Sequence, residues 1–185
     1  MLIGLGHRKQ SGKDTIAEYL VTKYGFRRLA FADLLKVLCG NVFGFSHAQL
    51  YGDQHTKEAN DPRFGFSPRH AMQTLGEGMR TMFGPDVWLH AIASSLGDPR
   101  FPHTVLSDVR YPNEANMLRR RGAILVRVDR PTEATHDAHS SEHSMDTYDY
   151  DTVLRNDHDI PKLYSAVDSL LAYYGYDTKE PRDQR

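Results

Sequence analysis

Short apolar runs alternate along the chain with longer segments whose apolar residues recur at helical spacing. The first run, Leu2–Gly6, is typical of a strand, and it is followed by a predicted helix over 13–24 in which Ile16, Leu20 and Tyr24 lie four residues apart. Strands alternating with helices predict an α/β fold with a parallel sheet covered on both faces. The further predicted strands cover 26–31, 103–108, 123–129 and 153–154.

Two long polar segments interrupt this alternation. Residues 44–68 are rich in glycine, aspartate, proline and histidine, and they are too long for an ordinary connection, so they predict a functional insertion containing short helices. Residues 130–149 are rich in histidine and poor in large aliphatic residues, which predicts a mobile loop. Helix starts are predicted at Asp33, as an N-cap, and at Ser67-Pro68, where proline follows a capping serine.

Composition and charge narrow the class of protein. The 185 residues are 39% apolar and 25% charged, as in an ordinary globular domain. The 23 Lys+Arg and 24 Asp+Glu give a net charge of −1, which argues against a dedicated nucleic-acid binder. The single Cys39 excludes an intramolecular disulfide and favours the reducing cytoplasm, and no apolar run approaches the ~18 residues of a membrane span.

The strongest chemical signal lies between the first strand and the first helix, from Gly4 to Thr15. Phosphate binding needs inward-facing backbone N–H groups at a helix N-terminus, and glycines with a lysine, here Lys13, supply this. The match to G-x-x-x-x-G-K-[ST] is imperfect, because His7 stands at the first glycine position and Asp14 follows the lysine. A dinucleotide fingerprint fails at Lys9, where its third glycine belongs. We therefore predict a phosphate loop, the alternative being a glycine-rich turn that starts a helix.

The helix after Ser67-Pro68 carries three kinds of face. Its predicted core face consists of Met72, Leu75, Met79, Met82 and Phe83. The face expected in water consists of His70, Thr74, Glu77 and Thr81. A flanking strip consists of Arg69, Gln73, Gly76 and Arg80. Two guanidiniums, a carboxamide and a position with no side chain suit a small planar anion, although an ordinary solvated boundary face has the same pattern.

The third predicted strand ends in Asp108, with Arg110 two residues later. Ligands of open α/β sheets bind at the carboxyl ends of the strands, where a carboxylate can hold magnesium and an arginine can bind phosphate. The alternative is a turn-forming aspartate followed by an exposed arginine.

A set of short motifs in a fixed order extends this picture over most of the chain. The motifs are Ser11–Thr15, Phe31–Lys36, Ser67–Arg69, Gln73–Glu77, Gly84–Trp88, Ser107–Arg110, His139–Glu142 and Asn156-Asp157. Together they resemble the deoxynucleoside monophosphate kinases of bacteriophages, a branch of the P-loop nucleoside monophosphate kinase superfamily. The resemblance implies a three-layer sandwich with a five-stranded parallel sheet in adenylate-kinase-like strand order, ATP with Mg²⁺ as donor, and a deoxynucleoside monophosphate as acceptor.

The resemblance also implies roles for individual residues, by matching position. ATP would be bound by Ser11, Gly12, Lys13, Asp14, Thr15 and Asn156. The acceptor would be bound by Asp33, Lys36, Arg69, Gln73, Arg80, Trp88, Arg110 and Glu142. The catalytic residues would be Lys13, Asp108, Arg110 and Arg130. Magnesium would be held by Thr15 directly and by Asp108 through water.

From these observations we expect one kinase domain over 1–176, followed by a flexible tail at 177–185. Its acceptor-binding insertion would cover about 44–85, and its lid about 130–149. Nucleotides are the expected partners, without nucleic acid or membrane, in the cytoplasm of a host cell if the protein is phage-encoded. Whether the protein forms a homodimer, and which base it prefers, stay open.

Three alternatives remain at this point. One is a P-loop kinase of a non-nucleotide phosphate, which shares the Gly-Lys-Asp start. Another is an ATP-binding switch or packaging subunit that transfers no phosphate to a small molecule. The third is a metal site at His136, His139 and His143, whose spacing suits one helical face, although histidines in a polar loop are usually solvated.

Overall fold

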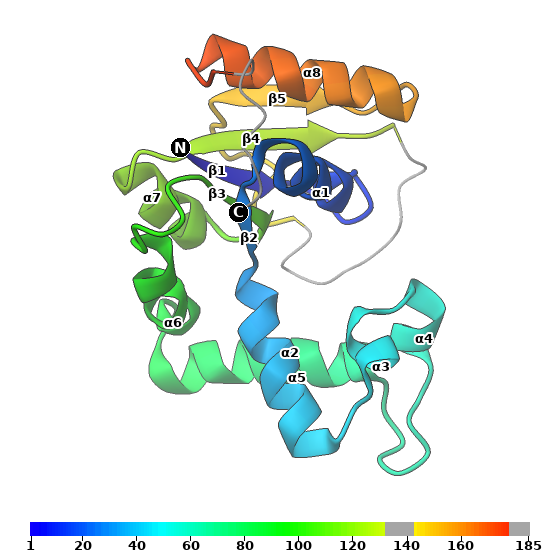
Figure 1. Ribbon diagram of the computed structural model, residues 1–185. Helices are drawn as coiled ribbons and strands as arrows, with labels where there is room; N and C mark the ends of the chain where they lie inside the picture. Colours follow the sequence, from blue (N-terminus) through cyan, green and yellow to red (C-terminus); the bar gives the residue numbers. More distant parts are fainter. Residues whose placement is uncertain (132–142, 178–185) are drawn as a thin grey trace. The chain divides into compact units, whose positions relative to one another are not determined.

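Figure 1 shows the computed structural model of the chain, which describes residues 1–131 and 143–177. Its contacts divide the chain into two compact units. We call Met1–Ala30 together with Ala93–Arg185 the sheet unit, and Phe31–Ile92 the helical unit.

The sheet unit contains five parallel strands in the order β2-β3-β1-β4-β5. They are β1 (Leu2–Gly6), β2 (Arg27–Leu29), β3 (Thr104–Val109), β4 (Ile124–Asp129) and β5 (Thr152–Arg155). The central strand β1 pairs with β3 and with β4, so that Gly6 lies opposite Val109 on one side and opposite Arg127 on the other. This confirms the predicted five-stranded parallel sheet, and it brings the ends of β1, β3 and β4 to one edge.

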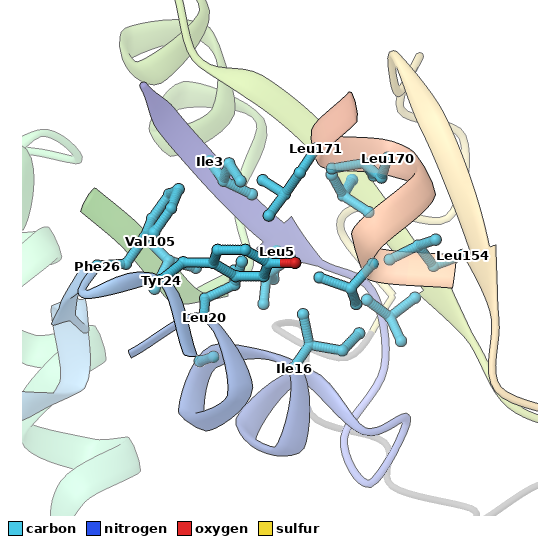
Figure 2. Close-up of a cluster of buried hydrophobic side chains, with 14 of the residues drawn as sticks. Ile3, Leu5, Ile16, Leu20, Tyr24, Phe26, Val105, Leu154, Leu170 and Leu171 are labelled. Carbon is cyan, nitrogen blue, oxygen red and sulfur yellow. The ribbon is translucent and has the colours of Figure 1, made fainter. Parts of the chain in front are cut away.

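The two faces of the sheet are covered by different helices. Helices α1 (Lys13–Tyr24) and α8 (Ile160–Tyr173) close the main hydrophobic cluster, and Figure 2 shows Leu20 and Leu171 around Leu5. Helix α7 (Pro112–Arg120) covers the other face. A Cβ on Gly4 would lie 3.1 Å from Leu118 of α7. Glycine at this position therefore lets α7 approach β1 closely.

A partly buried polar contact joins α1 to α8. Asp168 of α8 accepts hydrogen bonds from the hydroxyls of Tyr19, at 2.8 Å, and Tyr24, at 2.7 Å, while Lys23 lies 2.9 Å from its second oxygen. Burial and Asp168 raise the pKa of Tyr24 to about 12. Three groups of α1 therefore hold one carboxylate at the end of the helix away from its first turn.

The helical unit is built from α2 (Phe31–Phe43), α3 (His47–Tyr51), α4 (Gln54–Glu58) and α5 (Pro68–Phe83), together with the start of α6 (Val87–Leu96). Its core contains Cys39, Phe45, Leu50 and Ala71. The predicted start of α5 is confirmed, because the Ser67 hydroxyl accepts a hydrogen bond from the amide of His70 at 3.1 Å.

Two sequence expectations in this unit are wrong. Helix α2 begins at Phe31, so Asp33 lies in its first turn, where its charge suits the helix dipole, and is not the N-cap. The core face of α5 does not extend to its C-terminal end, since Met82 and Phe83 are 66% and 68% exposed. The buried positions of α5 are Pro68 and the small residues Ala71 and Gly76. The face expected in water is confirmed as exposed at His70, Thr74, Glu77 and Thr81.

Within the described residues, we find no helix with the length and apolar character that crossing a membrane requires.

Candidate active site

The loop between β1 and α1 has an unusual backbone. His7, Gln10 and Gly12 have φ values of 89°, 59° and 104°, in the left-handed region that favours glycine. His7 and Gln10 are the non-glycine residues with this conformation in the described chain. The backbone at His7 thus has the conformation that the missing first glycine of the motif would adopt without strain.

This loop curls around the ammonium of Lys13. The side chain is buried, and Nζ donates to the carbonyl oxygen of His7 at 3.1 Å, to that of Arg8, and to the hydroxyl of Ser11 at 3.2 Å. Gly12 precedes the helix and supplies no side-chain cap, which leaves the first amides of α1 to other acceptors. A cation enclosed by a loop at a helix N-terminus is the arrangement that binds phosphate.

Asn156, just after β5, closes the loop from the far end of the chain. Its side-chain amide donates to the carbonyl of Ser11 at 2.9 Å, and its backbone amide donates to the carbonyl of Asp129 at 2.7 Å. A Cβ on Gly12 would collide with the Asn156 amide. The structure therefore brings together three residues, Ser11, Gly12 and Asn156, that the sequence assigned to one site.

The two residues after Lys13 differ in their surroundings. The carboxylate of Asp14 is exposed and lies 2.7 Å from Nη2 of Arg28 in β2, while the expectation that Asp14 contributes to ATP binding stays a prediction. Thr15 is half-buried in the first turn of α1, where its hydroxyl is an oxygen donor of the kind that magnesium accepts.

The strand ends carry the other expected residues of the sheet unit. Asp108 is half-buried at the end of β3, next to the strand that leads into the loop. The buried Glu114 accepts hydrogen bonds from the backbone amides of Arg110, at 2.8 Å, and Tyr111, at 3.1 Å, which fixes the turn after β3. Arg130 is exposed directly after β4.

Four residues beside the loop have contacts that the motifs did not indicate. The His7 ring lies with Nδ1 3.0 Å from Oδ1 of Asp129 and Nε2 3.6 Å from Oδ1 of Asp146. Tyr150 covers Gly6, where a Cβ would come within 2.6 Å of its hydroxyl, and burial raises its pKa. Asp129 could have been found from its place at the end of a predicted strand, the rule that selected Asp108. No sequence signal places Asp146 or Tyr150 against the loop.

In the helical unit, the expected acceptor residues lie on two helices. Arg69, Gln73 and Arg80 are half-buried along α5, and Nη1 of Arg69 lies 3.7 Å from Glu58 in α4. Asp33 and Lys36 of α2 are 3.4 Å apart, and the Lys36 ammonium lies over the ring of Tyr51. These side chains supply several charges of both signs within one unit.

Gly76 and Trp88 both have structural roles in the helical unit. A Cβ on Gly76 would lie 3.2 Å from Leu35 of α2, so this glycine allows two helices to pack and does not leave room for a ligand. The indole N–H of Trp88 donates to the carbonyl of Gly76 at 3.2 Å, and the ring is buried. This hydrogen bond holds α6 to α5, and the expected role of Trp88 in acceptor binding stays a prediction.

Part of the expected lid, with Glu142, His136 and His139, lies outside the described residues. His143 is exposed, with Nδ1 3.3 Å from Asp146. No cluster of histidine, cysteine or acidic side chains suited to a metal ion occurs within 1–131 and 143–177.

A glycine-containing loop after the central strand of a parallel sheet, followed by a buried lysine at the start of the first helix, is typical of the class of P-loop phosphotransferases. The profile of the deoxynucleotide monophosphate kinase family matches residues 41–167, more than half of the chain. The chain belongs to this family, as the motifs indicated.

Individual relatives agree with this assignment. A protein of Acanthamoeba polyphaga mimivirus, provisionally named a deoxynucleotide monophosphate kinase, is 37% identical over 92% of this chain and 96% of its own length. The deoxynucleotide monophosphate kinase of Escherichia phage RB69 is 27% identical over 69% of this chain, which spans 54% of that longer protein. Among solved structures, TT1252 from Thermus thermophilus has a similar fold, with a TM-score of 0.53 at 18% identity over 94% of this chain and 97% of that one.

Proposed function

We propose that this protein transfers the γ-phosphate of ATP to a deoxynucleoside monophosphate, giving a deoxynucleoside diphosphate and ADP. The observation that carries the proposal is the buried ammonium of Lys13, enclosed by the loop of a chain that belongs to the deoxynucleotide monophosphate kinase family. The kinase family implies ATP as the phosphate donor.

The donor half of the site is the loop of the sheet unit. Phosphate oxygens would replace the carbonyls of His7 and Arg8 as the acceptors of Lys13, and they would accept hydrogen bonds from the first amides of α1. Asn156 holds the loop in this shape and lies where it can border the base of the nucleotide. Preorganised donors of this kind stabilise the negative charge of the transferring group.

The oxygen donors beside the loop fit a magnesium ion. Mg²⁺ takes one or two protein oxygens and fills its other positions with water and substrate phosphates. The hydroxyl of Thr15 would be a direct ligand, and the carboxylate of Asp108 would hold a coordinated water. When bound, the ion neutralises charge on the phosphates.

The acceptor half draws on arginines. We assign acceptor binding to Arg69, Gln73 and Arg80 of α5, with Asp33 and Lys36 of α2. Arg110, after β3, would bind the phosphate of the acceptor, and Arg130 would neutralise the transferring group. Guanidinium groups bind phosphate through two parallel hydrogen bonds, and Gln73 can hydrogen-bond a base edge.

The chemistry then needs no covalent intermediate on the protein. A phosphate oxygen of the acceptor attacks the γ-phosphorus of ATP in line with the departing ADP oxygen, and the protein contributes positioning and charge neutralisation. We therefore assign no nucleophile.

An activity panel tests the function directly. The protein is incubated with ATP, Mg²⁺ and each of the four deoxynucleoside monophosphates, and the products are separated by anion-exchange chromatography. We expect a deoxynucleoside diphosphate and an equal amount of ADP with at least one acceptor. ADP formed equally without any acceptor would support an ATP-hydrolysing switch, and no product across the panel would favour a non-nucleotide acceptor.

A further inference from the structure

We infer that His7 is a positioning residue of the phosphate loop, which it ties to the end of β4 through Asp129. The inference rests on the proposed function only in so far as the loop binds ATP. It starts from a conflict between backbone and side chain, because His7 has a φ of 89°, a conformation in which glycine is favoured. A strained residue at a ligand loop is a reason to ask what its side chain does.

The side chain makes a specific contact that glycine could not make. The ring is 11% exposed, and Nδ1 lies 3.0 Å from Oδ1 of Asp129. The same carboxylate oxygen accepts a hydrogen bond from Nε of Arg127 at 2.7 Å. Asp129 is thus fixed from its own strand, so the contact from His7 attaches the loop to a rigid part of the sheet.

The same residue also touches the phosphate-binding lysine. The carbonyl oxygen of His7 accepts a hydrogen bond from Nζ of Lys13 at 3.1 Å. Rotation of the peptide at His7 would therefore move an acceptor of Lys13. The contact of the ring with Asp129 restrains that rotation and in this way sets the direction of the Lys13 ammonium before phosphate oxygens replace the carbonyl as its acceptor.

Charged side chains of both signs face the His7 ring. Arg127 and Asp129 face it from β4, Arg8 faces it from the loop, and Asp146 faces it from the segment after 142. Burial, and next to it the charge of Arg127, lower the pKa of His7. A lowered pKa favours the neutral ring, which faces Asp129 through Nδ1 and Asp146 through Nε2.

Two substitutions at position 7 test whether the side chain of His7 positions the loop. His7→Gly removes the ring and relieves the backbone strain, so we expect a folded protein with an intact motif but a mobile loop. His7→Asn keeps a donor near the place of Nδ1, and asparagine tolerates a positive φ. We expect the glycine variant to bind ATP about tenfold more weakly, a loss comparable to that of one hydrogen bond, because it lacks the contact with Asp129, and we expect the asparagine variant to stay within about threefold of wild type.

The experiment measures ATP·Mg²⁺ binding by titration calorimetry for wild type, His7→Gly, His7→Asn and Asp129→Ala, with thermal melting to confirm folding. We expect Asp129→Ala to resemble His7→Gly, and in the kinase assay we expect the glycine variant to raise KM for ATP more than it lowers kcat. Wild-type affinity in His7→Gly or in Asp129→Ala would overturn the inference, and so would an asparagine variant as weak as the glycine variant. If the wild-type protein binds ATP but phosphorylates no acceptor, only the proposed function is overturned. The ATP affinities of the variants relative to wild type still test the role of His7.

Discussion

The side-chain amide of Asn156 donates a hydrogen bond to the main-chain carbonyl of Ser11, 2.9 Å away and 145 residues earlier in the chain. The backbone amide of the same residue is bonded to Asp129 at the end of β4. One residue after the last strand therefore fixes the loop that follows the first strand. The shape of the phosphate loop depends on the assembled sheet as well as on the loop's own glycines.

Removing this contact should loosen ATP binding without unfolding the protein. In Asn156→Ala the carbonyl of Ser11 loses its donor, and we expect KM for ATP to rise about tenfold, equivalent to one hydrogen bond. Steady-state kinetics with ATP as the varied substrate measure this. Asn41→Ala, at an exposed position of α2, is the matched control and should leave KM unchanged. An equal rise in both variants would contradict the prediction.

Lys13 should be required for turnover. Its ammonium is the buried cation of the loop, and Lys13→Ala removes it together with its bonds to His7, Arg8 and Ser11. We expect kcat/KM to fall by about a hundredfold or more, the usual effect of losing a charge-stabilising group. Lys23→Ala, on the same helix but bonded to Asp168, controls for a general effect of losing a lysine. Turnover in Lys13→Ala equal to that of the control would remove the loop from the mechanism.

Two glycines with similar backbones should respond differently to alanine. Gly12 and Gly25 have φ values of 104° and 67°, so alanine costs about 1–2 kcal/mol of unfolding free energy at either position. At Gly25 no atom lies within 4 Å of the added Cβ, whereas at Gly12 the Cβ meets the amide of Asn156. We expect Gly12→Ala to lose more stability and also ATP affinity, and Gly25→Ala to lose stability alone. Urea unfolding and calorimetry check both, and indistinguishable variants would refute the claim.

A second pair of glycines lies within α5. A Cβ at Gly78 meets one atom at 4.0 Å, so Gly78→Ala should raise the free energy of unfolding by about 0.5–1 kcal/mol through helix propensity. A Cβ at Gly76 would press against Leu35 at 3.2 Å, and this variant should gain less or lose stability. Denaturant midpoints of the two variants measure the difference. A greater gain at Gly76 would show that α2 and α5 do not pack through this position.

Acid should destabilise the wild-type protein more than His7→Asn. The pKa of His7 in the folded chain is lowered from its ordinary value of 6.5, chiefly by burial, so below that pH the unfolded chain binds the proton more readily. The stability that the neutral ring contributes is fully present above about pH 6.5 and is lost as the pH falls through the lowered pKa. Melting temperatures at pH 8, 7, 6 and 5 should therefore fall more steeply for wild type. Parallel curves would show that the His7 ring does not titrate as described.

Periodicity and local motifs predicted the features of this protein that depend on nearby residues. The five strands, the helix after the loop and the Ser67 cap follow from patterns within a few residues, and the strand-end rule selected Asp108. One error is local, because α2 begins two residues before the expected N-cap Asp33. The other concerns packing between helices, since helical spacing cannot show that α5 packs through Ala71 and Gly76. The contacts of His7 could not be predicted either, because Asp129 and Asp146 lie more than a hundred residues away from it in the sequence.

The carboxylate of Asp168, held by Tyr19, Lys23 and Tyr24, has a consequence for the release of spent nucleotide. It holds the C-terminal half of α1 against α8, so α1 is a rigid support for the loop that precedes it. We therefore expect the flexibility that nucleotide exchange requires to come from the few residues before Lys13. Exchange at this site is expected to be a local event, confined to a segment shorter than two helical turns.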